Sequence, residues 1–275
     1  ESLEKEHGDL EFSRREKVED LETVKAEYLI RHVDLAFEAW RRVPEAQRVP
    51  FEAFLEHILP YRGSQEPIDD WLDPLLRRYA GKTRAHASGE KVDEMYKWLK
   101  KDIAKRVRFN PRYYLQPTDQ GFKEMGRTGK GRSEDISNMM TFAARSVGLA
   151  TAVDFTPAWG HRDNNHAWNV LIGPDGKGSD KGNAHAAKVY RKKFSLQRDA
   201  LPYRLPEGRD APNRFLASKT IVDVTDQYAP TTDVTVELDP AVRGDERFAY
   251  LCVFNAGRWV AIHWGEVDSS GKVTF

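Results

Sequence analysis

Three polar residues along the chain have the types and the order of a nucleophile, a base and an orienting acid. Ser133 stands in GRSED, His166 stands in HAWNV, and Asp180 ends the stretch GPDGKGSD. A histidine beside a nucleophile can take its proton, and an acidic or amide group can orient that histidine. A helix N-terminus favours negative charge on a nucleophile placed there. The three residues therefore predict acyl-transfer chemistry.

The segments around these residues are predicted to position them. Apolar and small residues repeat at helical spacing over 136–147, and Gly148 is placed as the C-terminal stop of this helix. Two strand-like segments, 151–155 and 166–172, follow and are separated by the loop TPAWGHRDNN. Ser133 would thus open the helix, and His166 would begin the second strand.

The first part of the chain is predicted to be helical. Residues 1–110 keep apolar residues at three- and four-residue steps, and the charge-rich first 16 residues favour a solvated or frayed helix end. The expected helices cover residues 18–40, 51–58, 71–79 and 92–107, the third of them closed by Gly81. Residues 111–132 are rich in Gly, Pro, Asn and Thr, which predicts a surface loop.

Short strands are expected from residue 219 onward, after a polar and irregular stretch over 173–215. We therefore predict an α+β fold with a helical leader region (1–110), a core (111–218) and a β-rich region (219–275). The last strand, KVTF, has no closing element after it. We expect the β-rich region to be incomplete and residues 272–275 to form an edge strand or a frayed terminus.

The stretch from 129 to 172 resembles the centre of a transglutaminase-like domain, in the papain-like class of cysteine enzymes. The family pattern is Gly-x-Cys at a helix start, Arg-x-x-Gly at the helix end and His-x-Trp on a later strand. The matching residues are Gly131 and Ser133, Arg145 and Gly148, and His166 and Trp168. FEAFLEHILPYR, with Glu66 and Trp71 after it, and the strands from DVTDQYAP onward resemble a bacterial, mostly surface-associated branch.

This resemblance implies a transglutaminase-like core and acyl transfer at the amide of a protein or peptide substrate. The implied triad is Ser133, His166 and Asp180, acting as a peptidase, an amidase or a transamidase. Backbone N–H groups at the start of the helix would stabilise the oxyanion. Nothing in the sequence indicates calcium or an organic cofactor. The resemblance implies an extracytoplasmic location, in the periplasm or at the cell surface.

Serine at the nucleophile position departs from the family pattern. The chemistry requires a thiol, whose pKa of about 8.5 can be lowered until thiolate and imidazolium coexist. A hydroxyl titrates far higher, so we expect this chain to be inactive. Ser133 is either an introduced Cys→Ser replacement, which we favour because the surrounding motif is intact, or a native feature of a non-catalytic binding module. A serine hydrolase is disfavoured because GRSED is not the GxSxG elbow.

Several other residues have alternative interpretations. Asp175 and Asn169 are alternatives to Asp180 as the orienting group, because Asp is also common in polar turns. Trp159 and Trp168 could line a substrate groove, shield the base or simply pack. Asp154 is expected to make structural hydrogen bonds.

A second nucleophile and a metal site are both disfavoured. Cys252 is the only cysteine and lies in the apolar segment FAYLCVF, so we expect it to be buried and protonated even if His263 approaches it. The polar residues His161, Asp163, His166 and His185 match no helix-borne metal motif.

Composition excludes some partners. The chain has 43 basic and 43 acidic residues, so no net charge attracts it to nucleic acid or to an anionic membrane. No apolar run approaches the roughly 20 residues of a membrane span. A single cysteine excludes an intramolecular disulfide, and the pattern does not predict an oligomeric state.

Overall fold

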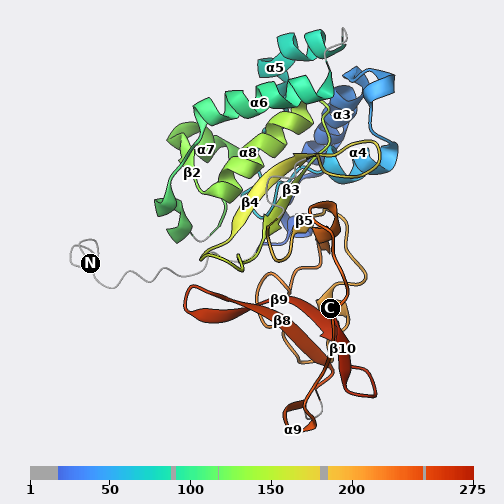
Figure 1. Cartoon of the computed structure of the whole chain (residues 1–275). Helices are drawn as coiled ribbons and strands as arrows, with labels where there is room; N and C mark the ends of the chain where they lie inside the picture. Colours follow the sequence, from blue (N-terminus) through green and yellow to red (C-terminus); the bar gives the residue numbers. More distant parts are fainter. Residues whose placement is uncertain (1–17, 88–90, 117, 180–184, 244–245) are drawn as a thin grey trace, which may run out of the picture.

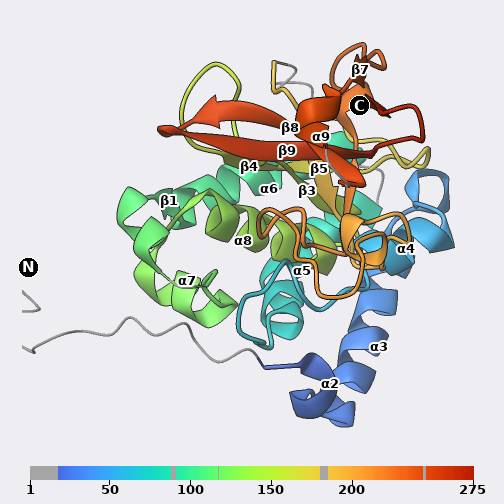
Figure 2. The same cartoon turned by 90° about the horizontal axis from the view of Figure 1, so that it is seen from below.

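A layer of helices, a small antiparallel sheet and a β-hairpin lie one after another in the computed structural model (Figure 1, Figure 2). The structure describes residues 18–87, 91–116, 118–179, 185–243 and 246–275. The predicted α+β class is confirmed, and the sheet separates the helices from the hairpin.

The helical layer is built around α8 (Ser133–Ser146), the helix predicted from 136 to 147. The helices N-terminal to it include α2 (Asp20–Thr23), α3 (Ala26–Arg42), α4 (Phe51–His57), α5 (Leu72–Ala87) and α6 (Val92–Arg106). The ring of Trp71 stacks on Phe142 of α8 with centroids 4.8 Å apart. The expectation that this helix ends at Gly81 is wrong, because α5 continues to Ala87. A glycine inside a helix costs only about 1 kcal/mol, and buried Tyr79 and Thr83 hold this turn against the core.

The central sheet has the strand order β4-β3-β5-β6, and all of its pairs are antiparallel. Its strands are β3 (Thr151–Thr156), β4 (His166–Leu171), β5 (Tyr190–Lys192) and β6 (Ile221–Asp223). Strands β3 and β4 confirm the two predicted segments. Their register places His166, the first residue of β4, opposite Thr156 at the end of β3.

The expected surface loop over 111–132 is wrong in part. It contains the 3-10 turn Pro111–Leu115, the helix α7 (Phe122–Thr128) and the strand β2 (Lys130–Gly131), which pairs in parallel with β1 (Arg108–Phe109). Met125 of α7 is fully buried in the main core. A short helix forms here because tertiary burial outweighs a local composition rich in glycine.

The C-terminal region is a hairpin with two small strands beside it. Strands β8 (Phe248–Asn255) and β9 (Arg258–Glu266) pair through a turn in which Ala256 and Gly257 both have positive φ, as this tight hairpin turn requires. The 3-10 turn Leu201–Tyr203 lies between β5 and β6. Between β6 and the hairpin are the 3-10 turn Thr225–Gln227, β7 (Thr235–Glu237) and α9 (Pro240–Arg243). The last strand, β10 (Lys272–Thr274), pairs with β7 in a two-stranded sheet, which agrees with the expected edge position.

One large hydrophobic core joins the helices to the central sheet, running from Ala36 to Tyr228 along the chain. Gly148 shows how closely these parts approach. It has φ +78°, and a Cβ there would lie 2.3 Å from the carbonyl oxygen of Ala39 in α3. Only glycine satisfies both the left-handed turn after α8 and this close approach. The proposed boundary at residue 110 between leader and core stays a prediction.

Candidate functional site

The start of α8 is fixed by the buried carboxylate of Asp135. This carboxylate accepts the backbone N–H of Arg132 at 2.9 Å, which forms a capping box, and it also accepts the backbone N–H of Gln120 at 2.8 Å. A Cβ at Gly131 would lie 2.6 Å from the Cβ of Asp135. The motif glycine therefore lets the chain enter the helix close to its cap, and it sets the position of Ser133 at the first helical residue.

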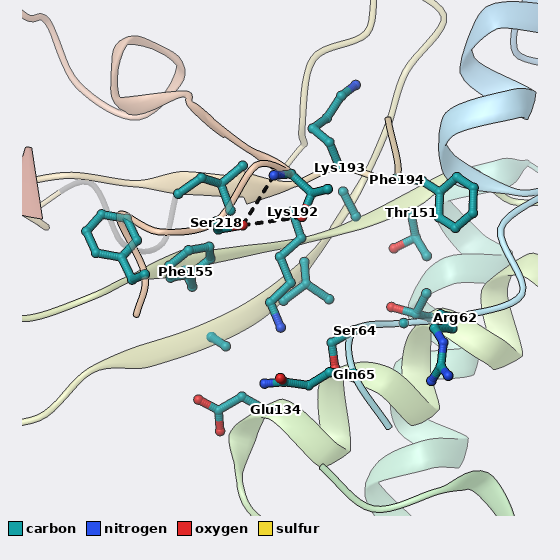
Figure 3. Close-up of a pocket in the computed structure, with 18 of the residues that line it drawn as sticks. Arg62, Ser64, Gln65, Glu134, Thr151, Phe155, Lys192, Lys193, Phe194 and Ser218 are labelled. Atoms are coloured by element: carbon teal, nitrogen blue, oxygen red, sulfur yellow. Dashed lines mark hydrogen bonds between the residues drawn. The ribbon is translucent and has the colours of Figure 1, made fainter. Parts of the chain in front are cut away.

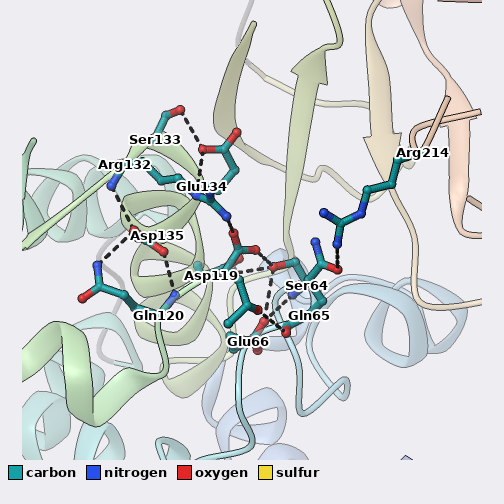
Figure 4. A network of polar contacts seen from close by, with 12 residues as sticks. Ser64, Gln65, Glu66, Asp119, Gln120, Arg132, Ser133, Glu134, Asp135 and Arg214 are labelled. Carbon is teal, nitrogen blue, oxygen red and sulfur yellow. Dashed lines mark hydrogen bonds and ion pairs between the residues drawn. The ribbon is translucent and has the colours of Figure 1, made fainter. Parts of the chain in front are cut away.

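Ser133 lies beside a network of charged side chains (Figure 4). Its hydroxyl donates a hydrogen bond to Glu134 Oε2 at 3.2 Å. The carboxylate of Glu134 lies 3.7 Å from Arg132 Nε, and the same guanidinium donates to buried Asp119 at 2.5 Å. Asp119 in turn accepts from the hydroxyl of Ser64, which belongs to the loop between α4 and α5. The network therefore ties the start of α8 to the loop between α4 and α5.

His166 begins β4 and is half-buried between aromatic rings. Its ring stacks on Trp159 with centroids 6.2 Å apart and lies 5.5 Å from Trp168. Burial lowers the pKa of His166, and the nearby Arg162 lowers it further, whereas the carboxylate of Glu134 acts in the opposite direction. The imidazole is therefore biased toward its neutral form, which is the form that can accept a proton.

Behind these rings lies a buried ion pair. Asp154 of β3 accepts two hydrogen bonds from Arg191 of β5, both at 2.8 Å, and one from the hydroxyl of Tyr228 at 2.8 Å. The same hydroxyl accepts the indole N–H of Trp168 at 2.8 Å. The expected structural role of Asp154 is confirmed. The network holds Trp168, and Trp168 in turn holds one side of His166.

A cleft of about 570 Å³ opens between α8, the sheet and two distant loops (Figure 3). Its lining includes Glu134 and His166, residues 62–65 of the loop before α5, residues 192–194 at the end of β5, and residues 214–215. Glu134 directly follows Ser133, so the start of α8 and the histidine of β4 share this cleft.

The comparison with known families agrees with this geometry. Residues 76–177 match the transglutaminase-like superfamily. This part of the chain is a transglutaminase-like domain. The match spans α8, β3 and β4 and thus contains both Ser133 and His166. A transglutaminase-like domain indicates a papain-like family of acyl transferases and hydrolases. No curated protein matches the chain.

The structure brings the expected residues of the transglutaminase-like domain together only in part. Ser133 begins α8, as predicted, but its hydroxyl and the His166 ring make no hydrogen bond with each other. Asp180 lies outside the described residues, and its role stays a prediction. Asp175 is exposed and accepts the backbone N–H of Lys177 in its own turn. Asn169 points toward α8, where it donates to the carbonyl of Ser137 and to the hydroxyl of Thr141.

Trp159 and Trp168 of the transglutaminase-like domain are buried and in contact with the His166 ring, which they partly cover. Arg145, the motif arginine, is also buried and donates to the backbone carbonyls of His57, Pro60 and Arg62. It therefore holds the loop that forms one wall of the cleft.

The rival nucleophile is not paired with its histidine. In the hairpin, Cys252 lies opposite Ala261, and His263 lies opposite Leu251. The His263 ring instead meets the hydroxyl of Tyr190 at 2.8 Å. Cys252 is only partly buried, which corrects the expectation of full burial, but burial still raises the pKa of its thiol.

No group of three or more metal-ligating side chains occurs in the part of the chain that the structure describes. The rings of His161 and His185 lie against Trp159, and Asp163 accepts the backbone N–H of Ala256. Within the described ranges, no helix is long and apolar enough to cross a membrane.

Sequence reasoning missed the polar surroundings of the site. Glu134 stood in the quoted motif, but nothing in its spacing indicates that it takes the hydroxyl of Ser133. Residues 62–65, 192–194 and 214–215 lie far from the motif in the chain, and only the fold brings them to the cleft.

Proposed function

We propose that the start of α8 and His166 form an acyl-transfer site of the transglutaminase type, and that this site is inactive here because Ser133 replaces the nucleophilic cysteine. The observation that carries the proposal is the shared cleft, which Glu134 and His166 both line. We assign the nucleophile position to residue 133, the base to His166 and the orienting acid to Asp180.

In the active form of such a site, the thiolate at position 133 attacks the amide carbonyl. Backbone N–H groups at the start of α8 stabilise the oxyanion, because the first N–H groups of a helix have no partner within it. The imidazolium of His166 gives its proton to the leaving amine. The acyl group then passes to water, as in a peptidase or amidase, or to a second amine, as in a transamidase.

The hydrogen bond of Ser133 supports inactivity in the chain as it stands. A serine hydroxyl needs a base to accept its proton, and here that proton points to Glu134 rather than to His166. A carboxylate is a weak base, and its negative charge opposes an alkoxide beside it. The same observation favours a second candidate, a binding module that keeps the cleft and does no chemistry.

Alkylation of an introduced cysteine separates the two candidates. Ser133→Cys is made in a Cys252→Ser background, and its rate of reaction with iodoacetamide is measured against pH. The proposal expects a thiol pKa below the ordinary value of about 8.5, and it expects His166→Ala to raise that pKa. His263→Ala, which removes a histidine outside the cleft lining, is the matched control.

Glu134→Gln provides a further arm of this experiment. It removes a negative charge beside the thiolate and should lower the thiol pKa of Ser133→Cys further. A cysteine that titrates at its ordinary pKa, with or without His166, would refute the acyl-transfer site. The binding module would then be the better description. The periplasmic or cell-surface location is part of the same proposal and is supported by the resemblance alone.

A further inference from the structure

The cleft contains two cationic side chains that form no ion pair with a carboxylate of the described residues and are not enclosed by backbone carbonyls. Lys192 of β5 lines the cleft and makes no side-chain hydrogen bond or ion pair with any described residue. Arg214 also lines it and donates to the neutral amide oxygen of Gln65 at 2.7 Å. Both side chains therefore keep their charge available to a bound molecule.

The other charged residues of the cleft already have partners. Arg62 pairs with Asp20, which lies outside the cleft lining. Lys193 lies 3.7 Å from Glu56, and Glu56 also accepts the hydroxyl of Ser195 at 2.6 Å. Arg145 of the lining has no ion pair in the described part of the chain either, but it is buried and donates to the backbone carbonyls of His57, Pro60 and Arg62. Lys192 and Arg214 therefore remain as the cations of the lining that a bound anion can pair with.

Both cations point toward Gln65 in the lining of the cleft. Figure 3 shows the side chain of Lys192 extending toward Gln65 and Glu134, and Figure 4 shows Arg214 reaching Gln65. Glu134 directly follows the nucleophile position. An anionic group held by these cations would therefore lie close to the amide that faces residue 133.

Neither of the two carboxylates near Lys192, those of Asp119 and Glu134, forms an ion pair with it. Asp119 is close enough to feel the charge of Lys192, but it is buried and already accepts hydrogen bonds from Arg132 and Ser64. Glu134 lies beyond ion-pair distance of Lys192 and is held by Ser133 and Arg132.

The floor of the cleft adds an uncharged hydrogen-bonding group. His57 lines the cleft, is 5% exposed, and its ring has no hydrogen-bond partner among the described residues. Burial, together with Lys193, lowers its pKa to about 2, so the ring is neutral and carries one N–H donor. It can bind a peptide carbonyl without adding charge.

We propose that the cleft selects amide substrates that carry a carboxylate next to the scissile bond, and that Lys192 and Arg214 bind this carboxylate. The inference rests on the acyl-transfer site proposed above, because that site fixes where the amide lies. A peptide offers such a group in two ways, as an Asp or Glu side chain or as a free C-terminal carboxylate. Lysine and arginine bind both by charge-assisted hydrogen bonds.

Binding of matched peptides tests this preference without catalysis. The native chain, with Ser133, is titrated calorimetrically with acetyl-Ala-Gln-Glu-Ala-amide and with its neutral counterpart acetyl-Ala-Gln-Gln-Ala-amide. A third peptide, acetyl-Ala-Gln with a free carboxylate, distinguishes the terminal source from the side-chain source. We expect at least one acidic peptide to bind roughly tenfold more tightly than the neutral one, the scale of one charge-assisted hydrogen bond. The difference should shrink between about 50 mM and about 500 mM salt.

Substitutions then assign the preference to the two cations. Lys192→Gln should remove most of the difference between acidic and neutral peptides, and Arg214→Gln should reduce it, while affinity for the neutral peptide stays unchanged. Lys101→Gln and Arg258→Gln are the matched controls, since both residues are exposed, unpaired among described residues and outside the cleft. Thermal unfolding of each variant checks that it folds.

Each outcome separates this inference from the proposed function. Equal affinity for acidic and neutral peptides would overturn the carboxylate preference, as would an equal loss in the control variants. If Ser133→Cys is activated by His166 but no preference exists, the acyl-transfer site stands and this inference fails. If acidic peptides are preferred but Ser133→Cys behaves as an ordinary thiol, the carboxylate site stands on a binding module.

Discussion

Replacing Arg191 with methionine removes one half of a buried ion pair and leaves the other half without compensation. Arg191 and Asp154 have side chains that are 3% and 0% exposed, and two hydrogen bonds of 2.8 Å join them. Methionine keeps much of the side-chain volume, so the change acts mainly through charge. The carboxylate of Asp154 then keeps only the hydrogen bond from Tyr228.

The expected loss of stability is large. Removing one partner of a buried ion pair costs about 3–5 kcal/mol, because the remaining charge is desolvated and unpaired. With a urea m-value of about 3 kcal/mol/M, the midpoint of unfolding should fall by about 1–1.7 M. The double variant Asp154→Leu/Arg191→Met removes both charges and should recover much of this loss.

Urea unfolding followed by circular dichroism measures all the members of this double-mutant cycle. Tyr228→Phe is the graded control, since it removes one hydrogen bond to Asp154 and the acceptor of the Trp168 indole, at a cost of about 1–3 kcal/mol. Burial and the neighbouring Asp154 raise the pKa of Tyr228 far above its ordinary value, so it is a donor at every accessible pH. A loss below about 1 kcal/mol for Arg191→Met, or losses that simply add in the double variant, would refute the reasoning.

Three further changes test other parts of the fold. Burial lowers the pKa of His32 to about 4 and that of His57 to about 2, so below pH 6.5 the unfolded chain binds protons at these histidines more readily than the folded chain does. The free energy of unfolding in urea should therefore fall by about 2 kcal/mol for each histidine between pH 7 and pH 5, and His32→Gln should remove its share of this fall. Gly148→Ala should lower the melting temperature by several degrees, because its Cβ would meet the carbonyl of Ala39, whereas a harmless change would refute the close approach. Asp135→Ala should cost about 1–2 kcal/mol in urea unfolding by uncapping α8, and an unchanged midpoint would contradict the capping role.

The elements that carry the motif could be predicted because local pattern and tertiary burial agree there. Helix α8 has apolar residues at helical spacing and a glycine stop, and β3 and β4 are apolar runs beside turn residues. Helix α7 was missed, because its seven residues include a glycine and two polar stretches flank it. Its burial comes from the fold and not from its own sequence.

The candidate site shows the same division. Residues 133 and 166 could be found from motif spacing, which reflects the positions of a helix start and a strand start. The partners of these residues could not. Arg132, Asp119 and Ser64 form one network from three separate segments, and a sequence does not reveal which charges lie within hydrogen-bond distance.

The environment of residue 133 bears on the choice between an enzyme and a binding module. Two features favour a negative charge there, the start of α8 and the guanidinium of Arg132 near Glu134. One feature opposes it, the Glu134 carboxylate that lies 3.2 Å from the hydroxyl. A serine is compatible with these surroundings because its hydroxyl donates a hydrogen bond to the Glu134 carboxylate. A thiolate cannot donate, so the Glu134 carboxylate would have to move away from residue 133 and toward Arg132. Only a cysteine at this position has to form an anion, so the Glu134 carboxylate should take a different orientation when residue 133 is cysteine. The change in the thiol pKa of Ser133→Cys on adding Glu134→Gln measures how strongly this carboxylate opposes the thiolate.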